Sequence, residues 1–218
     1  MKTFKPKIVS YVYNVNMTTS AQDTVWLERV ESLFMRYGIK SITMDDVARD
    51  LGISKKTLYQ MVESKDALVV KVLGHHISRE KTQCVCLVKD SSNAIEEIFN
   101  IMDTNSQELA QMKTNILNDL QKYHRDAWLM IRNFQYDFVL KIICENLTRG
   151  RNEGYYRDDF DIDIVAKLHL STAFNLFDEQ IFPAASTPKI TLFKEYMMHF
   201  LHGIVSAKGL AYIKKKLS

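Results

Sequence analysis

The chain is poor in residues that interrupt helices. Its 218 residues include only 7 glycines and 3 prolines, whereas β-rich proteins need frequent turns that contain these residues. With 46% hydrophobic residues, a chain of this length can bury the core of one large or two small domains. We therefore expect an all-α protein with about nine helices in all.

Cysteine is also scarce, which argues against a disulfide framework. The three cysteines, Cys84, Cys86 and Cys144, are an odd number and lack the spacing of a metal-binding pair. Cys84 and Cys86 would point to different faces of a helix. We expect all three to be reduced thiols, as in a cytoplasmic protein.

Long apolar runs are absent. No stretch approaches the ~20 consecutive apolar residues that a membrane-spanning helix needs. The first residues resemble a signal peptide faintly, but Asn14 and Asn16 interrupt the apolar run after the N-terminal lysines. We expect a cytoplasmic protein with no membrane partner, in which residues 1–16 form a flexible N-terminal extension.

The excess of positive charge is small. A formal net charge of +3 and a pI near 8.6 do not by themselves indicate a nucleic-acid partner. From Asp23 to His75 there are 8 lysines and arginines and 8 acidic residues, so this region has no net formal charge. If it binds DNA, the affinity must come from the placement of individual lysines.

What the sequence does contain is a series of marked helix ends. An amphipathic stripe over residues 23–37 ends at Gly38, which can adopt the left-handed conformation that closes a helix. Thr43 and Asp46 have the spacing of a capping box at the start of a short second helix, which Gly52 closes.

A third helix follows after a turn of three residues. Ser54 can cap it, and it runs from Lys55 to Met61 with Leu58 facing the core. Two short helices joined by a glycine-containing turn, behind a longer supporting helix, form a helix-turn-helix whose second helix fits the DNA major groove.

The remainder of the chain also predicts helices. Ser64 can cap a long fourth helix that reaches Lys89. Further helices are expected over residues 91–104, 106–122, 125–150, 160–182 and 187–207. The acidic stretch from Asp158 to Asp163 is interpreted as a helix cap, and the lysines at 214–216 as a solvated tail.

The helix-turn-helix region resembles the tetracycline-repressor (TetR) family of bacterial regulators. The resemblance is carried, in order and without a gap, by Val30, Leu33-Phe34, Tyr37-Gly38, Ser41-Ile42-Thr43, Asp46-Val47-Ala48, Leu51 to Lys55, Thr57-Leu58-Tyr59 and Ser64 to Leu68. It implies a DNA-binding domain at residues 17–70 with three N-terminal helices, followed by a larger helical domain at 71–218 for effector binding and dimerisation.

The resemblance also implies which side chains contact DNA: Thr43, Lys55, Lys56, Thr57, Tyr59 and Lys65. We add Gln60 on its chemistry, because it can read adenine or hold a phosphate. Lysine suits guanine O6 and N7, and glutamine suits adenine. The chain departs from the family pattern at residues 60–62, where an aromatic or histidine pair is common. It also departs at Lys56, where a small residue or proline is common. The operator sequence therefore cannot be inferred from a relative.

For the second domain the resemblance implies a homodimer that pairs through the helices at about 160–182 and 187–207. It also implies a pocket for a small, mainly hydrophobic effector, whose binding releases the repressor from a palindromic operator. The expected pocket residues are Trp128, Phe134, Phe138, Phe174 and Phe177. Each of these aromatic residues can instead be plain core.

Two other functions stay open. A dimeric adaptor that has lost DNA binding would explain the charge-balanced first domain. The residues that argue against it are Lys55, Lys56, Thr57, Tyr59 and Lys65. A helical enzyme would need an acid, base or metal set, and we find no catalytic residues, no cofactor motif and no metal ligands in the sequence. His199 and His202, for example, are three residues apart without a cysteine or carboxylate partner.

Overall fold

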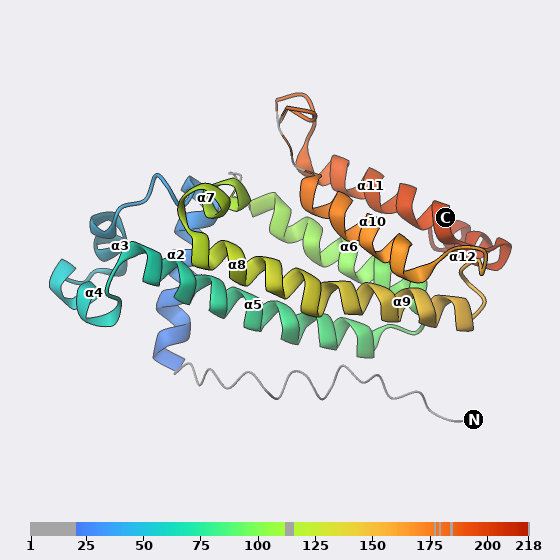
Figure 1. The fold of residues 1–218 in the computed structure, drawn as a ribbon, viewed down its shortest axis with the longest axis horizontal. Helices are drawn as coiled ribbons and strands as arrows, with labels where there is room; N and C mark the ends of the chain where they lie inside the picture. Colours follow the sequence, from blue (N-terminus) through green and yellow to red (C-terminus); the bar gives the residue numbers. More distant parts are fainter. Residues whose placement is uncertain (1–20, 112–115, 177, 179, 184, 218) are drawn as a thin grey trace. The chain divides into compact units, whose positions relative to one another are not determined.

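A computed structural model describes residues 21–111, 116–176, 178, 180–183 and 185–217 (Figure 1). Within these residues every regular element is a helix, and the only extended pairing is an isolated bridge between Tyr156 and Val205. The predicted all-α class is confirmed. None of the described helices is both long and apolar enough to cross a membrane.

The chain divides into two compact units. The first covers Met1–Val85 and Gln111–Phe134, and the second covers Cys86–Ala110 and Gln135–Ser218. The predicted domain boundary after residue 70 lies inside a long helix and stays a prediction. The sequence pattern gave no sign that residues 111–134 belong with the N-terminal helices.

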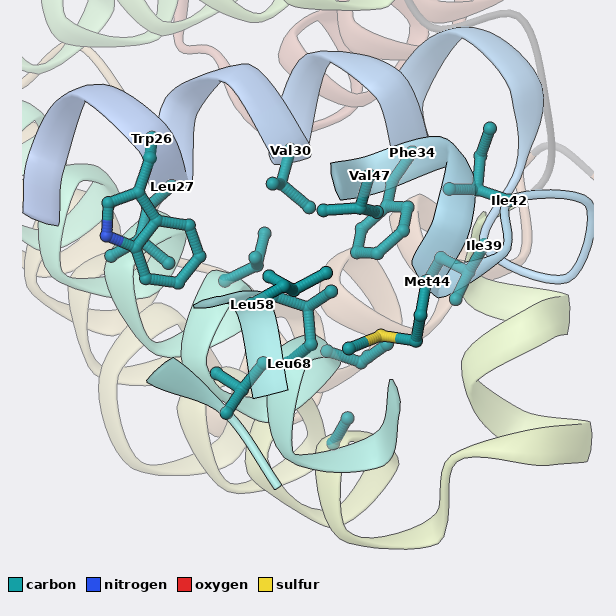
Figure 2. Packing of buried hydrophobic residues seen from close by; sticks show 14 of the residues in the cluster. Trp26, Leu27, Val30, Phe34, Ile39, Ile42, Met44, Val47, Leu58 and Leu68 are labelled. Atoms are coloured by element: carbon teal, nitrogen blue, oxygen red, sulfur yellow. The ribbon is translucent and has the colours of Figure 1, made fainter. Parts of the chain in front are cut away.

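The first unit is built from helices at both ends of its sequence range: α2 (Ala21–Tyr37), α3 (Met44–Leu51), α4 (Lys55–Met61), the larger part of α5 (Lys65–Asp90), α7 (Ile116–Tyr123) and α8 (Arg125–Phe134). They share one hydrophobic core, in which Val30, Leu58 and Leu68 are completely buried. Figure 2 shows side chains of α2, α3 and α4 meeting around Leu58. The predicted inward orientation of Leu58 is therefore confirmed.

The helix ends of the first unit follow the sequence signals. Gly38 and Gly52 have φ angles of 84° and 70°, in the left-handed region that favours glycine. The Thr43 hydroxyl accepts a hydrogen bond from the Asp46 amide at 3.2 Å, and the Asp46 carboxylate accepts one from the Thr43 amide at 3.0 Å. The predicted capping box is confirmed.

Polar contacts tie α7 and α8 to the N-terminal helices. The Lys40 backbone amide donates to Asp119 Oδ2 at 3.0 Å, and the Lys40 ammonium donates to the Tyr123 hydroxyl at 3.1 Å. His124 Nδ1 lies 2.5 Å from Asp66 Oδ1 in the first turn of α5. These contacts, together with buried Leu120 and Ala127, explain why residues 111–134 belong to the first unit.

The second unit contains all of α6 (Ala94–Gln111) except its last residue, together with α9 (Leu140–Asn152), α10 (Ile162–Asn175), α11 (Lys189–Ile204) and α12 (Ala207–Leu217). A π-helical segment, η1 (Gln135–Val139), precedes α9, so the helix predicted over 125–150 is interrupted by a π-helical turn. The N-terminal cap of α10 is a carboxylate, because Asp161 accepts a hydrogen bond from the Ile164 amide at 3.0 Å. The predicted cap in this acidic stretch is confirmed.

The C-terminal lysines correct one expectation. Residues 207–217 form α12, and Ile213 is buried in the second core. The Lys216 ammonium lies 2.7 Å from Glu96 Oε1 and 5.3 Å from the centre of the Phe99 ring. Lys216 is thus paired with α6 and is not part of a solvated tail.

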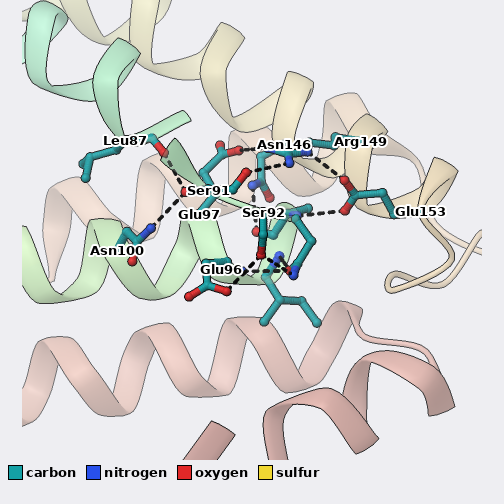
Figure 3. Close-up of polar contacts among 12 residues, drawn as sticks. Leu87, Ser91, Ser92, Glu96, Glu97, Asn100, Asn146, Arg149 and Glu153 are labelled. Atoms are coloured by element: carbon teal, nitrogen blue, oxygen red, sulfur yellow. Dashed lines mark hydrogen bonds and ion pairs between the residues drawn. The ribbon is translucent and has the colours of Figure 1, made fainter. Parts of the chain in front are cut away.

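A polar cluster joins α6 to α9 (Figure 3). The Arg149 guanidinium donates to Glu97 at 3.2 Å, to Glu153 at 2.8 Å and to the Ser91 carbonyl at 2.9 Å. The Glu97 residue is only 2% exposed, and burial raises the pKa of its carboxyl. Because Arg149 supplies the charge and the hydrogen bonds that Glu97 needs in the interior, the pair fixes the start of α6.

Candidate nucleic-acid interface

The turn between α3 and α4 is set by three consecutive residues. The Ile53 amide donates to the Ala48 carbonyl at 3.0 Å across Gly52, and Ser54 Oγ accepts from the Thr57 amide at 3.0 Å. Leu58 anchors α4 to the core. The turn therefore has fixed geometry, and α4 turns one face inward and the other to solvent.

The outward face of α4 carries the predicted DNA contacts. Lys55, Lys56, Thr57, Tyr59 and Gln60 are all exposed, and Tyr59 retains 44% of its accessible surface. An exposed face with two cations, a hydroxyl, a phenol and an amide offers donors to both phosphates and base edges. The structure brings these five residues together on one short helix.

The two adjacent lysines of α4 have different environments. Lys55 Nζ lies 2.7 Å from Asp45 Oδ1 on α3, and this hydrogen bond raises the pKa of the Lys55 ammonium. Lys56 forms no ion pair with any residue that the structure describes. Sequence reasoning missed the contribution of Asp45, because the two side chains meet only after the turn brings α3 and α4 together.

Thr43 is exposed at the start of α3, as its predicted role requires. Its hydroxyl is already used in the capping box, where it donates to Asp46 Oδ2 at 2.6 Å. This hydrogen bond lowers the pKa of the Asp46 carboxyl. The phosphate contact assigned to Thr43 stays a prediction.

Lys65 and Lys40 are a second pair of neighbouring lysines, and a backbone carbonyl positions one of them. Lys65 Nζ donates to the Lys40 carbonyl at 3.3 Å, and partial burial lowers the pKa of Lys65. The Lys40 ammonium lies 4.9 Å from the centre of the Tyr123 ring. The sequence analysis assigned a DNA contact to Lys65. Tyr123 lies 83 residues from Lys40 in the chain, so no local signal indicates the contact between them.

The predicted effector-pocket residues are spread over both units. Trp128 and Phe134 are half-buried in the first unit, and Phe138 is buried in η1 of the second. Phe177 and the side chain of Phe174 lie outside the described residues. The assignment of these five residues to one pocket stays a prediction.

A hollow lies elsewhere on the first unit. It has a volume of about 660 Å³ and is open to solvent, and its lining residues are Leu33, Tyr37, Ser41, Ile42, Asp46, Arg49 and Asp50. None of the predicted pocket residues contributes to it. In the described part of the chain, no three histidine, cysteine or acidic residues are grouped as metal ligands.

The sequence of the first unit matches a known family. The model of bacterial regulatory proteins of the tetR family matches residues 27–72, which cover α3, α4 and parts of α2 and α5. The chain is 35% identical over 118 residues to the transcriptional regulator YvaF of Bacillus subtilis, an alignment that spans 51% of this chain and 62% of YvaF.

A second relative is the transcriptional repressor KstR2 of Mycobacterium tuberculosis. It is 23% identical over 154 residues, which are 68% of this chain and 76% of KstR2. The alignment therefore extends beyond the helix-turn-helix region.

Solved structures have the same fold. A TetR-family regulator from Agrobacterium tumefaciens superposes with a TM-score of 0.71 at 16% identity, covering 85% of this chain and 99% of that one. A regulator from Saccharomonospora viridis, solved with choline, also gives a TM-score of 0.71 at 16% identity, covering 86% of this chain and all of that one. Residues 27–72 of this chain thus match the tetR family of bacterial regulatory proteins, and the chain shares its fold with solved structures of such regulators.

Proposed function

We propose that the chain is a cytoplasmic, sequence-specific DNA-binding regulator that represses transcription from a palindromic operator. The observation that carries this proposal is the outward face of α4, where five exposed polar side chains lie on a helix anchored from behind by Leu58. A helix held in this way can enter the major groove without losing its own packing.

The proposed contacts divide into two groups. Lys55, Lys56 and Gln60 read base edges, because lysine suits guanine and glutamine suits adenine. Thr43 and Lys65 bind phosphates on either side of α4, and Thr57 and Tyr59 contact the backbone or bases. Phosphate contacts set the position of the helix, and base contacts supply the specificity.

The operator is proposed to be palindromic because the protein acts as a homodimer. On α10, Ile164 and Leu168 lie one turn apart and are 57% and 62% exposed. Large exposed apolar residues at this spacing are typical of a helix that pairs with another copy. The proposed interface comprises residues 160–182 and 187–207, and it spaces two copies of α4 by ~34 Å, one turn of DNA.

The release signal is proposed to be a small, mainly hydrophobic effector that binds the C-terminal domain. Relatives support a small-molecule effector: KstR2 of M. tuberculosis is named a ketosteroid regulator, after a hydrophobic molecule, and the S. viridis regulator was solved with choline, a small cation. An effector that binds better to one dimer spacing than to another shifts the protein toward that spacing.

One observation favours a second function, that of a dimeric adaptor without DNA binding. The first unit has no net charge from residue 23 to 75, and one of its α4 lysines is already paired with Asp45. Lys56, Lys40 and Lys65 remain as cations for a polyanion, so DNA binding is the better supported function.

Selection from a pool of random DNA duplexes tests the proposal. We expect the wild-type protein to enrich a palindrome with two half-sites about 10 base pairs apart, centre to centre. Sedimentation of the complex should give one dimer per enriched duplex. No enrichment of any sequence after repeated rounds would contradict sequence-specific binding and favour the adaptor.

A further inference from the structure

We propose that Asp45 is a specificity-determining residue of the α4 interface, because it holds the Lys55 ammonium on α3 and forces DNA to compete for that cation. The inference rests on the proposed DNA binding. Asp45 is not one of the proposed DNA contacts. It increases specificity by weakening binding to non-cognate sequences.

The two acidic residues that open α3 have separate roles. Asp46 belongs to the capping box, with hydrogen bonds to both the amide and the hydroxyl of Thr43. Asp45 takes no part in that cap, and its carboxylate lies 2.7 Å from Lys55 Nζ. The helix start is therefore stabilised without Asp45, and the Asp45 carboxylate is available to Lys55.

The Asp45–Lys55 pair lies on the surface that DNA would approach. Both side chains are 58% exposed, and the first turn of α4 contains no acidic residue of its own. A DNA phosphate that binds Lys55 must draw its ammonium away from the Asp45 carboxylate and tolerate that negative charge nearby. Phosphates of any sequence meet this cost, whereas a well-placed guanine is bound through two of the three ammonium hydrogens and leaves the third for Asp45.

Lys56 provides the internal comparison. It is also exposed on the same helix, yet it has no ion-pair partner among the described residues. Lys56 is thus free to contact any phosphate, while Lys55 is withheld until a better acceptor is present. Because exposed ion pairs are weak, the competition weakens non-cognate binding by up to about fivefold per subunit.

The test compares Asp45→Asn with Asp50→Asn. Asp50 lies on the same helix, so its replacement removes the same charge, but its partner is Arg29 at 3.3 Å. Each protein is titrated with a duplex selected by the wild type and with a scrambled duplex of equal composition, at several salt concentrations. Circular dichroism and thermal unfolding check that each variant is folded.

For Asp45→Asn we expect binding to the scrambled duplex to tighten by up to about fivefold per subunit, with a smaller improvement on the selected duplex. The dependence of log K on log salt for the scrambled duplex should steepen by about 0.9 for each additional phosphate that the variant neutralises. Asp50→Asn should behave as the wild type does. In a Lys55→Ala background, Asp45→Asn should have no effect on either duplex.

Three results would overturn the inference. An unchanged ratio of affinities and an unchanged salt slope, with or without a lower unfolding midpoint, would mean that the pair is merely structural. An equal improvement in the Lys55→Ala background would mean that Asp45 acts by simple repulsion of DNA. A wild-type protein that binds neither duplex would overturn the proposed function first, and the inference with it.

Discussion

Arg79 of α5 donates two hydrogen bonds to the Glu31 carboxylate of α2, from Nη1 to Oε2 at 3.0 Å and from Nη2 to Oε1 at 2.7 Å. His76, which is on α5 like Arg79, places its Nδ1 2.9 Å from Glu31 Oε1. The Glu31 side chain is only 11% exposed. The contacts of Glu31 with His76 and Arg79 therefore connect α2, which supports the helix-turn-helix, to α5, which follows it.

Replacement of Glu31 by glutamine should destabilise the protein in a pH-dependent way. Burial alone would raise the pKa of Glu31, but the hydrogen bonds and charges of His76 and Arg79 outweigh it and lower the pKa from 4.5 to about 2. A lowered pKa means that this stabilisation is present above pH 4.5 and is lost as the pH falls toward 2. Because solvent partly screens this group, the stabilisation is on the order of 1–2 kcal/mol.

The pKa of His76 is raised above 6.5, because the hydrogen bond and charge of Glu31 outweigh the effect of burial. Its stabilisation is present below pH 6.5 and is lost as the pH rises through the raised pKa. Denaturant unfolding of wild type and Glu31→Gln should therefore differ most between about pH 4.5 and 6.5. Glu28→Gln, on the exposed side of α2, is the control. A difference that does not vary with pH would contradict the assignment.

Gly52 should tolerate asparagine better than alanine. Its φ of 70° is in the left-handed region, and an added Cβ would meet no atom within 4 Å. The cost of alanine is therefore conformational, about 1 kcal/mol in the free energy of unfolding, and asparagine should lose less. Denaturant unfolding measures both. Equal stability of Gly52→Ala and wild type would contradict this, because it would mean that the backbone at residue 52 can leave the left-handed region without cost.

Gly150 and Gly203 should respond to alanine in opposite directions. A Cβ at Gly150 would lie 2.1 Å from two ring carbons of Tyr156, whereas one at Gly203 would meet nothing within 4 Å. Gly150→Ala should thus cost 1–3 kcal/mol or more through overpacking, as roughly estimated for crowded cores. Gly203→Ala, in helix α11, should stabilise the protein by about 0.5 kcal/mol. Thermal unfolding compares them, and equal effects would contradict the described packing.

A charge on the exposed face of α10 should separate the proposed dimer. Leu168→Glu places a carboxylate in an apolar contact between copies, so sedimentation velocity at micromolar concentration should show monomer. Leu129→Glu, on α8 and 49% exposed in wild type, is the matched control and should remain a dimer. If Leu168→Glu sediments as the wild type does, α10 does not form the interface.

The first unit was predicted well where its signals are local. Thr43, Ser54, Gly38 and Gly52 mark helix ends through contacts within a few residues, and each lies where the sequence placed it. The hydrogen bond from the Lys40 amide to the Asp119 carboxylate was not predicted. The two residues are 79 positions apart, so only the folded chain brings them together.

The second unit shows the same limit in another form. The lysines at 214–216 suggested a tail, although Leu210 and Ile213 three residues apart were an available sign of α12. The π-helical segment η1 was missed because the apolar pattern through residues 125–150 is continuous. Polar partners such as Glu97 and Arg149 are 52 positions apart and have no sequence signal that links them.

DNA titration of paired lysine variants measures whether α4 is the DNA-binding element. The variant Lys55→Ala/Lys56→Ala is compared with Lys214→Ala/Lys215→Ala, which removes two adjacent lysines from α12 of the second unit. Both are titrated with a duplex selected by the wild type, at two salt concentrations. The paired design keeps the change in net charge equal.

We expect the α4 variant to lose at least about tenfold in affinity, with a salt slope shallower by at least about 0.9, while the α12 variant binds as the wild type does. Equal affinity of the α4 variant and the wild type, or equal losses in both variants, would contradict the assignment of α4 as the recognition helix.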